Sequence, residues 1–491
     1  MGIRTGIILR ADFVFCLQAF GCSLVALQCS VASVLLCCCV SVNSHLIGAL
    51  ADRFCSEVKS GISRTKVLWS GGLSFIMATD NYTIPNVENT VKNIEGTIKN
   101  VTISRLTAPG ENFLSLIFKI DFEVEDQNGQ TKTISTVGKR FPLGERPGGM
   151  DSKSMTNEIR WYLEMVPLLV KSARQYEIPI EYYPKYMGSR FSLDPEVKKA
   201  DAESVLLLEN LIPQGFKNED RHIGFDLQST KALLRMMAQF HALPLVMKFK
   251  NPQAFSVLKD FLDETKMDFK KPPAEKPKDG KPRSPPDHSM VFDVMLKLPG
   301  CQKYKEKLEE IKNKTKAPPM SHKPGPEPWN TVVHCDFWVN NVMIKHVEGQ
   351  EPLTKLVDFQ FYRYSTFARD LVFFLLTSVK NQVQLEHFDD LLKYYYNQLT
   401  VILNKFNISE LELPYDKYLD LVKEAALETE TSHAIIFSTV VFGAKGLDNP
   451  DPLVGEVDMM EHMGNMIKNM NDIQKTKLEL ICELAGERGW L

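Results

Sequence analysis

Hydrophobic and polar residues alternate over short stretches in the first half of the chain. Over residues 114–122 every second position is Leu, Phe or Ile, which is the period of a half-buried strand. Asn128-Gly129 after this stretch is a strong hairpin signal and predicts a turn into a third strand. The same reasoning predicts the other strands over 102–106, 133–141, 181–186 and 204–208. A short polar helix is predicted over 86–95.

Helical spacing of hydrophobic residues replaces this alternation in the rest of the chain. The spacing predicts one helix over 155–171, among the strands, and one over 229–243, after them. His241, on the apolar side of the second helix, is expected to be a packed, hydrogen-bonded histidine. A helix-like segment follows over 291–312. Further helices are predicted over 371–378, 388–406, 415–443 and 457–486.

Two segments break the pattern. Residues 266–288 are rich in Pro and Lys, so they cannot bury apolar surface, and we expect a flexible or polyproline insertion. Residues 13–51 contain no Asp, Glu, Lys or Arg and are long enough to span a bilayer. The apolar, cysteine-rich extension over 1–76 has three interpretations: a membrane anchor, a signal sequence, or a dispensable segment before a true start at Met77.

Composition narrows the class of protein. The chain has 491 residues, a net charge of −3 and 44% hydrophobic residues, which is ordinary for a globular protein. It has neither a basic excess nor a basic patch with interleaved aromatic residues, so we expect no nucleic-acid partner. Seven of the ten cysteines lie before residue 56, so the remainder is interpreted as a reduced, cytoplasmic protein. A membrane-anchored protein is the alternative if residues 13–51 are retained.

The most informative stretch opens with His334-Cys335-Asp336. Asn341 follows Asp336 by five residues, and Asp358 comes after a polar turn. In phosphotransferases of the protein-kinase type, an Asp accepts the proton of the attacking hydroxyl. An Asn five residues later and an Asp on the next loop hold the Mg²⁺ ions that bridge the phosphates of ATP. We therefore predict Asp336 as the base and Asn341 and Asp358 as metal ligands, because Mg²⁺ prefers oxygen ligands.

The local pattern also brings these residues together. Strands over 342–344 and 353–357 flank the polar turn, and such a hairpin places Asn341 and Asp358 at its two open ends. Each short motif alone occurs by chance, but the full set in this order, with a hairpin between, argues against chance. Asp370, at the start of a helix, is expected to brace the catalytic loop or to cap the helix.

Residues upstream match the nucleotide-binding part of such an enzyme. Lys139 near the end of the third strand and Glu158 on the next helix match the ion pair that positions the α- and β-phosphates. Glu164 is the rival acid on the same helix. The turn containing Gly110 either covers the phosphates or is a plain hairpin. The last strand ends in residues that would border adenine: Glu209, Asn210 and Leu211.

With these residues placed, the chain resembles the ecdysteroid kinase-like family of insects, part of the wider choline kinase and aminoglycoside phosphotransferase group. The resemblance covers roughly residues 85–480. Its most specific match is Trp338-x-Asn340-Asn341 together with Asp358-Phe359-Gln360. The other matches are Gly110 to Ser115, Lys139, Glu158-x-x-x-Tyr162 with Pro167, Leu208 to Leu211, Phe240-His241-Ala242, His334-x-Asp336 and Asp370-Leu371.

The resemblance implies a fold and an activity. The fold is α+β and bilobal, protein-kinase-like, with a small antiparallel-sheet N-lobe over 77–211 and a larger helical C-lobe over 212–491. The activity is ATP-dependent, Mg²⁺-assisted phosphorylation of a hydroxyl on a small molecule, either an ecdysteroid, another sterol-like alcohol or a xenobiotic. The residues that would cover the phosphates are Gly110, Glu111, Asn112 and Ser115.

Two positions depart from the family's usual pattern. The family usually has Gly where this chain has Cys335, and glycine tolerates backbone angles that a residue with a Cβ resists. Apolar residues usually flank the strand lysine, whereas this chain has Gly138 and Arg140 around Lys139. The first departure motivates a second hypothesis, a catalytically silent small-molecule-binding protein of the same fold.

Overall fold

The computed structural model describes residues 82–107, 115–140, 150–267, 289–314, 324–443 and 459–491. The chain divides into two units, residues 1–80 and 81–491, and every described residue belongs to the second unit. The extension over 1–76, and nearly all of the insertion predicted over 266–288, lie outside the described residues.

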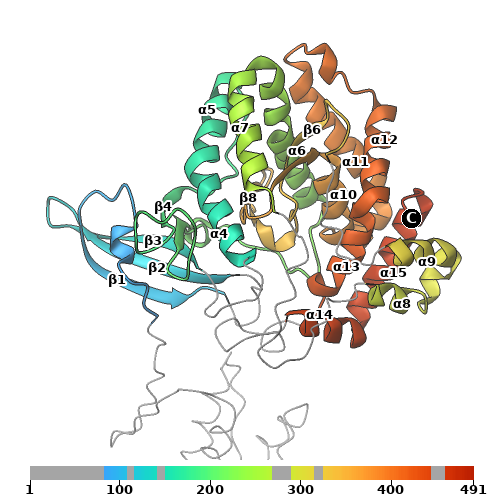
Figure 1. Ribbon diagram of the computed structural model, residues 1–491, viewed down its shortest axis with the longest axis horizontal. Helices are drawn as coiled ribbons and strands as arrows, with labels where there is room; N and C mark the ends of the chain where they lie inside the picture. Colours follow the sequence, from blue (N-terminus) through green and yellow to red (C-terminus); the bar gives the residue numbers. More distant parts are fainter. Residues whose placement is uncertain (1–81, 108–114, 141–149, 268–288, 315–323, 444–458) are drawn as a thin grey trace, which may run out of the picture. The chain divides into compact units, whose positions relative to one another are not determined.

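The strand-rich part forms one five-stranded antiparallel sheet, with the order β1-β2-β3-β5-β4 (Figure 1). Gly129 has a φ of 74° in the turn between β2 and β3, as the Asn-Gly pair predicts. The strands predicted over 102–106, 114–122, 133–141 and 204–208 are therefore confirmed, with shifted ends. The bounds of the five strands are β1 (Thr97–Arg105), β2 (Leu116–Glu125), β3 (Thr131–Arg140), β4 (Tyr186–Arg190) and β5 (Val205–Glu209).

The two faces of the sheet pack against different cores. On β5, Leu206 and Leu208 join the core of the helical part, whereas Val205 and Leu207 join a smaller core on the other face. Successive side chains of a strand point to opposite faces, so this alternation follows from the backbone. Lys139 on β3 pairs with Leu206 in the register, which places the lysine on the face toward the helical part.

The same alternation explains the unusual neighbours of Lys139. Gly138 lies on the outer face, where a Cβ would collide with the side chain of Ile120. Arg140 lies on that face too, and its guanidinium donates to Glu203 (3.1 Å) and to the backbone oxygen of Ala202 (2.7 Å). Both residues therefore take part in the packing and bonding of the outer face of the sheet.

Two predicted elements near the sheet are wrong in extent. Instead of a helix over 86–95 there is one 3₁₀ turn, Val87–Asn89, because Val91 pairs with Gly188 at the edge of the sheet. Strand β4 begins at Tyr186, the last residue of the predicted range of 181–186. Tyr182 and Tyr183 are buried in the helical core instead, where the Tyr183 ring lies 5.1 Å from that of Phe359.

The helical part contains the predicted helices, several of them longer than expected. Helix α6 (Leu227–Lys250) begins at Asp226, whose carboxylate accepts from the backbone of Ser229 (2.8 Å) and so caps the first turn. The others are α4 (Met150–Arg160), α5 (Val166–Tyr176), α7 (Pro252–Thr265), α10 (Ala368–Thr377), α11 (Asn381–Asn404), α12 (Tyr415–Ala425), α13 (Thr431–Val441), α14 (Met459–Lys468) and α15 (Asp472–Glu487).

Four of the predicted helices are interrupted. The one predicted over 457–486 breaks at residues 469–471, between α14 and α15. A π-helical turn, Trp161–Met165, joins α4 to α5, and a second one, Ala426–Glu430, joins α12 to α13. The segment predicted over 291–312 is split into α8 (Met290–Met295), a 3₁₀ turn (Pro299–Tyr304) and α9 (Lys305–Lys314). Pro299 lacks the backbone N–H that a continuous helix would need there.

Two small ladders lie within the helical part. Strand β6 (Asn330–Val333) pairs with β9 (Arg363–Thr366), and β7 (Val342–Lys345) pairs with β8 (Leu353–Leu356), all antiparallel. The second ladder confirms the hairpin predicted between Asn341 and Asp358.

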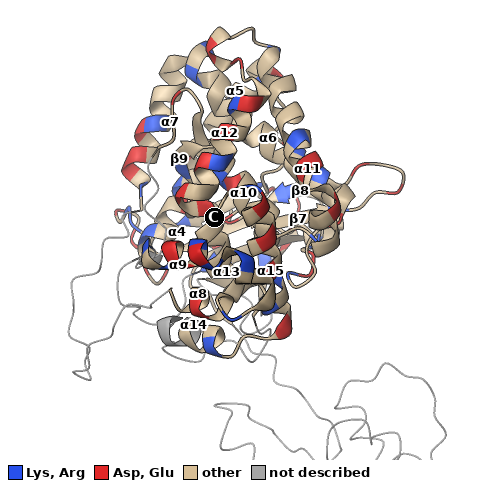
Figure 2. Ribbon diagram, turned by 90° about the vertical axis from the view of Figure 1, so that its right-hand side faces the viewer, with Lys and Arg blue, Asp and Glu red and all other residues tan. Residues whose placement is uncertain are grey.

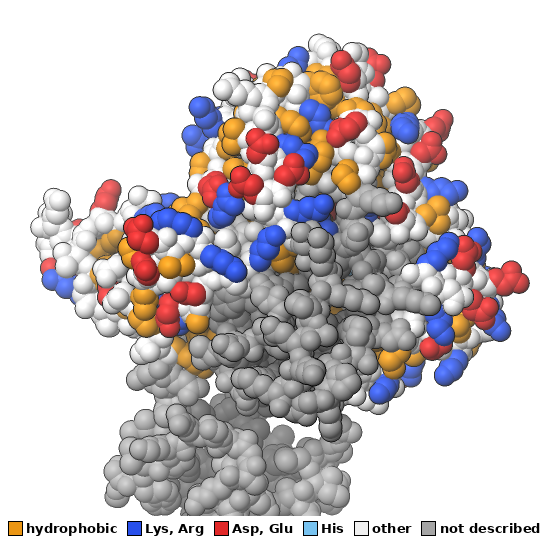
Figure 3. Space-filling model, viewed as in Figure 1, with side chains coloured by type: hydrophobic (Ala, Val, Ile, Leu, Met, Phe, Trp, Pro, Cys, Tyr) orange, Lys and Arg blue, Asp and Glu red, His pale blue; other side chains and the backbone are white. Residues whose placement is uncertain are grey.

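The visible surface of the described region carries mixed charge. Basic and acidic side chains are interspersed along the helices in Figure 2 and over the face in Figure 3. Neither view shows the one-signed basic face expected of a nucleic-acid binder. Within the described ranges, no helix is both long and apolar enough to cross a membrane.

Helix α15 carries a buried lysine among neutral partners. Lys477 is 1% exposed and donates to the backbone oxygen of Val379 and the side chain of Asn381 (both 3.1 Å), and to Gln384. Its ammonium also lies 5.4 Å from the centre of the Phe442 ring. Burial lowers the pKa of Lys477 to about 7, because no carboxylate among these partners offsets the lost hydration.

We predict that Lys477→Met changes how stability depends on pH. Unfolding returns the Lys477 pKa from about 7 toward 10.5, so the unfolded chain binds more protons between these values and the native chain gains stability as pH rises. The wild-type chain should therefore gain about 2 kcal/mol relative to the variant between pH 7 and pH 9. Urea unfolding of both chains at the two pH values measures this, and parallel pH profiles would contradict it.

Candidate active site

The catalytic loop and the β7–β8 hairpin place three predicted site residues together. Residues 334–338 follow β6, and a 3₁₀ turn, Val339–Asn341, leads into β7. The backbone N–H of Val357 donates to the oxygen of Asn341 (2.9 Å), which closes the open end of the hairpin beside Asp358. The side-chain amide of Asn341 donates to both the carboxylate (2.7 Å) and the backbone oxygen (2.9 Å) of Asp336.

A buried lysine connects the sheet to this hairpin. The Nζ atom of Lys139 lies 2.6 Å from Glu158 Oε2 on α4 and 2.6 Å from Asp358 Oδ1. The rival acid Glu164 instead pairs with Arg160 (2.6 Å) at the surface. Two consecutive elements, β3 and α4, therefore share one network of charges with the loop of Asp358, 219 residues after Lys139 in the chain.

Burial and neighbouring charge shift the pKa values of these groups. Burial alone would lower the pKa of Lys139, but the carboxylates of Asp358 and Glu158 outweigh it and raise the pKa above its ordinary value. Burial raises the pKa of Glu158 to about 7, although Lys139 opposes the shift. Burial, followed by the charge of Asp358, raises the pKa of Asp336 to about 8.

The donor set fits a magnesium–nucleotide complex. Asn341 uses its amide nitrogen toward Asp336, which leaves its carbonyl oxygen for another partner. Asp358 uses Oδ1 toward Lys139, which leaves Oδ2. In the described part of the chain no cluster of three or more His, Cys, Asp or Glu residues could hold a metal by itself. Two oxygen ligands suit Mg²⁺, which takes its remaining ligands from water and phosphates.

Asp370 holds the start of the catalytic loop. Its two carboxylate oxygens accept from the backbone N–H groups of His334 (2.6 Å) and Cys335 (2.9 Å). His241 lies 3.2 Å from the same carboxylate and 2.7 Å from the Tyr395 hydroxyl, so the prediction of a packed, hydrogen-bonded histidine is confirmed. Asp370 also lies in the first turn of α10, where the helix dipole favours a carboxylate. The same side chain therefore braces the loop and stabilises the start of the helix.

His334 fixes the loop from its other side. Its Nε2 donates to the backbone oxygen of Val357 (3.0 Å), directly before Asp358. Burial lowers the pKa of His334, which keeps the ring neutral with its proton on the nitrogen that faces the carbonyl. The pattern His-x-Asp thus connects the loop of Asp336 to the loop of Asp358.

The backbone is left-handed at two non-glycine residues of the site. Cys335 has a φ of 64° and Asp358 a φ of 70°, a region that costs a residue with a Cβ roughly 1–2 kcal/mol. Such outliers persist where the surrounding bonds over-determine the conformation. The Cys335 N–H bonded to Asp370 and the Asp358 carboxylate bonded to Lys139 are bonds of this kind.

The residues at the end of β5, which were predicted to border adenine, use their side chains to hold the sheet together. Glu209 accepts from the backbone of Lys185 (2.8 Å), and Asn210 donates to the Ser135 hydroxyl (3.0 Å). Leu211 is buried. The side chains of Glu209 and Asn210 therefore stabilise this end of the sheet.

Of the four residues predicted to cover the phosphates, the structure describes one. Ser115 is buried and directly precedes β2. Gly110, Glu111 and Asn112 lie outside the described residues.

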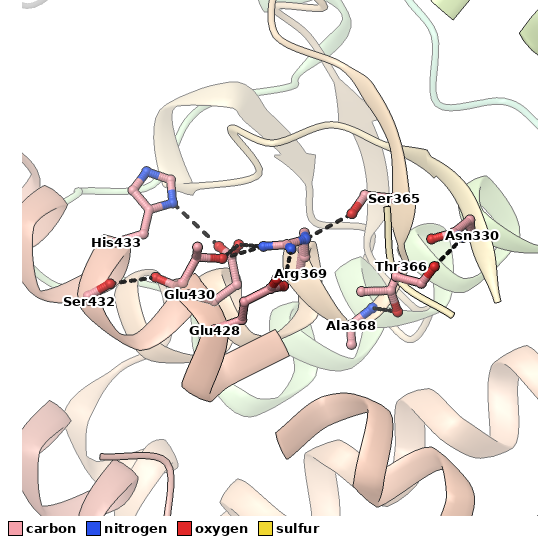
Figure 4. Close-up of polar contacts among 11 residues, drawn as sticks. Asn330, Ser365, Thr366, Ala368, Arg369, Glu428, Glu430, Ser432 and His433 are labelled. Atoms are coloured by element: carbon pink, nitrogen blue, oxygen red, sulfur yellow. Dashed lines mark hydrogen bonds and ion pairs between the residues drawn. The ribbon is translucent and has the colours of Figure 1, made fainter. Parts of the chain in front are cut away.

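The sequence did not indicate the cluster behind the catalytic loop. Arg369, next to Asp370, is 2% exposed and pairs with Glu430 (2.8 Å) and Glu428 (2.6 Å) on the second π-helical turn (Figure 4). Trp338 lies edge-on against Phe437 of α13, with ring centres 5.0 Å apart. Only the match of Trp338 to the family pattern could have drawn attention to this region.

Fold and site together define a class. The chain has an antiparallel five-stranded sheet joined to a helical part. A strand lysine, Lys139, pairs with a helix glutamate beside Asp336, Asn341 and Asp358. This is the arrangement of kinase-like small-molecule phosphotransferases. The chain belongs to the ecdysteroid kinase-like family, whose model matches residues 109–408, more than half of the chain. No curated protein sequence matches the chain.

Several solved structures are similar to the chain. The Plasmodium vivax ethanolamine kinase is 10% identical, with a TM-score of 0.37, over 80% of this chain and 86% of that one. A microcompartment-associated aminopropanol kinase is 12% identical, with a TM-score of 0.39, over 81% and 96%. A GDP complex of wild-type aminoglycoside 2'-phosphotransferase-IIIa is 13% identical, with a TM-score of 0.36, over 80% and 94%. The family assignment rests on the sequence match, and the description of the site rests on the geometry of the chain itself.

We predict that Glu158→Gln weakens nucleotide binding and turnover by about 10–100-fold, because the lysine loses one of the two carboxylates that position it. Glu164→Gln on the same helix is the matched control and should leave both unchanged, since Glu164 bonds to Arg160 at the surface. Titration calorimetry with Mg-ATP measures the binding, and equal effects of the two substitutions would contradict the prediction.

We also predict that Cys335→Gly yields a more stable protein than Cys335→Ala, by about 1 kcal/mol. Both variants remove the thiol, but only glycine adopts a φ of 64° without strain. Urea denaturation of the two variants isolates the effect of the Cβ atom. Equal stability of the variants would mean that the loop is not strained at this position.

Proposed function

We propose that this protein is a kinase that transfers the γ-phosphate of ATP to a hydroxyl of an ecdysteroid or a similar alcohol. The observation that carries the proposal is the contact of Lys139 with both Glu158 and Asp358, while Asn341 bonds to Asp336. In this arrangement a cation that would meet the α- and β-phosphates, two residues that would bind a divalent metal and a candidate base belong to one network. The family match to 109–408 supports the same class of reaction.

The residues would divide the chemistry as follows. Asp336 accepts the proton of the acceptor hydroxyl while the hydroxyl oxygen bonds to the γ-phosphorus. The bond between the γ-phosphorus and the oxygen that bridges to the β-phosphate breaks, and ADP leaves. Lys139 neutralises charge on the α- and β-phosphates. Asn341 and Asp358 would hold Mg²⁺, which when bound neutralises charge on the phosphate oxygens. We propose that the sheet, within 77–211, and the helical part, over 212–491, act as the two lobes around this site.

The raised pKa of Asp336 is consistent with the assignment of the base. Burial and the charge of Asp358 hold the pKa of Asp336 at about 8, so the carboxyl retains affinity for a proton near neutral pH. The amide of Asn341 bonds to the carboxylate and keeps it oriented. In its ionised form, which predominates above pH 8, a carboxylate with this orientation can take a proton from an alcohol during the transfer.

The hypothesis of a silent binding protein depended on Cys335. In the structure Cys335 adopts the left-handed conformation that glycine prefers, and its N–H is held by Asp370. The cysteine therefore does not displace the loop, and Asp336 keeps its bonds to Asn341. The conformation of Cys335 therefore supports the kinase over the silent binding protein.

We predict that Asp336→Asn lowers phosphotransfer by about 10²–10⁴-fold while Mg-ATP binding is retained, because an amide cannot take the proton. Transfer from labelled ATP to an ecdysteroid and aminoalcohol panel measures turnover, and the Mg-ATP-induced shift in melting temperature measures binding. Asp390→Asn, at an exposed position on α11, is the control and should act like wild type. Full turnover in Asp336→Asn would overturn the assignment.

A further inference from the structure

Strand β7 is hydrogen-bonded on the edge that faces away from β8 as well as on the edge toward it. The backbone N–H of Ile344 donates to the oxygen of Lys217 (2.8 Å), and the N–H of Lys217 donates to the oxygen of Ile344 (2.9 Å). Alternate residues of an antiparallel strand turn their backbone groups to the same edge, so Val342 turns its oxygen to the edge that Lys217 occupies. Lys217 therefore begins a third strand beside the hairpin.

The side chain of Asn218 continues this edge in place of a backbone. Its amide nitrogen donates to the backbone oxygens of Val342 (2.9 Å) and Asn340 (2.8 Å). A side-chain amide carries two N–H groups, so one asparagine can satisfy both oxygens at once. Asn218 is therefore bonded to the residue on each side of Asn341.

The backbone of Asn341 itself is bonded at both of its polar groups. Its N–H donates to the oxygen of Trp338 (3.0 Å), and its oxygen accepts from Val357 (2.9 Å). With the two bonds from Asn218, the carbonyl oxygens of three successive residues, 340–342, all have partners. These bonds fix the backbone from which the side chain of Asn341 projects.

The position of the Asn341 side chain depends on that backbone. Its amide nitrogen bonds to the carboxylate and the backbone oxygen of Asp336, which leaves the carbonyl oxygen as the atom for a metal. A shift of residues 340–342 would displace this oxygen and lengthen the bonds to Asp336. Residues that orient a metal ligand from behind affect metal affinity although they do not touch the metal.

The surroundings of Asn218 argue against a purely structural role. Its side chain is exposed to solvent, so it fills no part of the core. Both of its amide bonds are nevertheless made to the two neighbours of a single residue, the predicted metal ligand Asn341. Because replacing an exposed side chain leaves no cavity, substitution of Asn218 should perturb the placement of Asn341 and leave the fold intact.

We propose that Asn218 is a positioning residue for the nucleotide-bound Mg²⁺, because it holds the backbone on both sides of Asn341. The inference rests on the proposed kinase function and adds to it a residue from the segment after β5. Asn218 acts through Asn341 and is not itself a ligand.

The test separates ATP binding that depends on the metal from binding that does not. Titration calorimetry on the full chain measures the Kd for ATP with Mg²⁺ and, separately, with EDTA. Asn218→Ala should weaken binding of ATP with Mg²⁺ about tenfold, the lower end of the effect of losing a residue that orients a metal ligand. Binding of ATP with EDTA should be unchanged, because the pair of Lys139 and Glu158 does not involve Asn218.

Two further variants complete the series. Asn218→Asp has nearly the same shape but an ionised carboxylate donates no hydrogen bond, so it should lose at least as much Mg²⁺-dependent affinity as Asn218→Ala. Asn397→Ala, at an exposed position on α11, is the control and should bind ATP like wild type under both conditions. A melting temperature close to that of wild type without ligand shows that each variant is folded.

Three outcomes would overturn the inference: unchanged binding of ATP with Mg²⁺ in Asn218→Ala, an equal loss with Mg²⁺ and with EDTA, or equal binding under both conditions in wild type. Failure of the proposed function is distinguishable, because it would show as wild-type Mg-ATP binding without phosphate transfer to any acceptor. A wild-type chain that binds no ATP would overturn both.

Discussion

The ammonium group of Lys139 is the constraint on which the rest of the site depends. It is buried between β3, α4 and the loop after β8, and a buried charge is tolerated only where it is paired and hydrogen-bonded. Its two carboxylates, Glu158 and Asp358, come from elements that the chain order separates widely. Satisfying one cation therefore fixes the sheet, α4 and the loop of Asp358 relative to one another. A nucleotide phosphate entering the site would meet a cation that is already oriented.

A carboxylate performs the corresponding task for the catalytic loop. Asp370 accepts from two successive N–H groups, and that geometry requires the left-handed backbone seen at Cys335. The strain of roughly 1–2 kcal/mol at a residue with a Cβ is offset by bonds to a charged acceptor, which are the stronger kind. The loop is therefore held in place by Asp370. The residue type at position 335 changes the free-energy cost of the left-handed conformation and does not change the conformation itself.

Local rules in the sequence account for much of the fold and for the spacing of the site. Alternation over 114–122 and the Asn-Gly turn fix β2 and β3, and the order of Asp336, Asn341 and Asp358 around a hairpin predicts their proximity. Features that depend on distant partners could not be predicted. Val91 leaves the predicted helix because Gly188 pairs with it, and nothing near Arg369 in the sequence indicates a bond to Glu430.

Arg369 and Asp370 show how adjacent residues can couple two sites. Arg369 is fully enclosed and tied to the acids before α13, while Asp370 is tied to the loop that carries Asp336. Both lie in the first turn of α10, so this turn contacts the catalytic loop through Asp370 and the segment before α13 through Arg369.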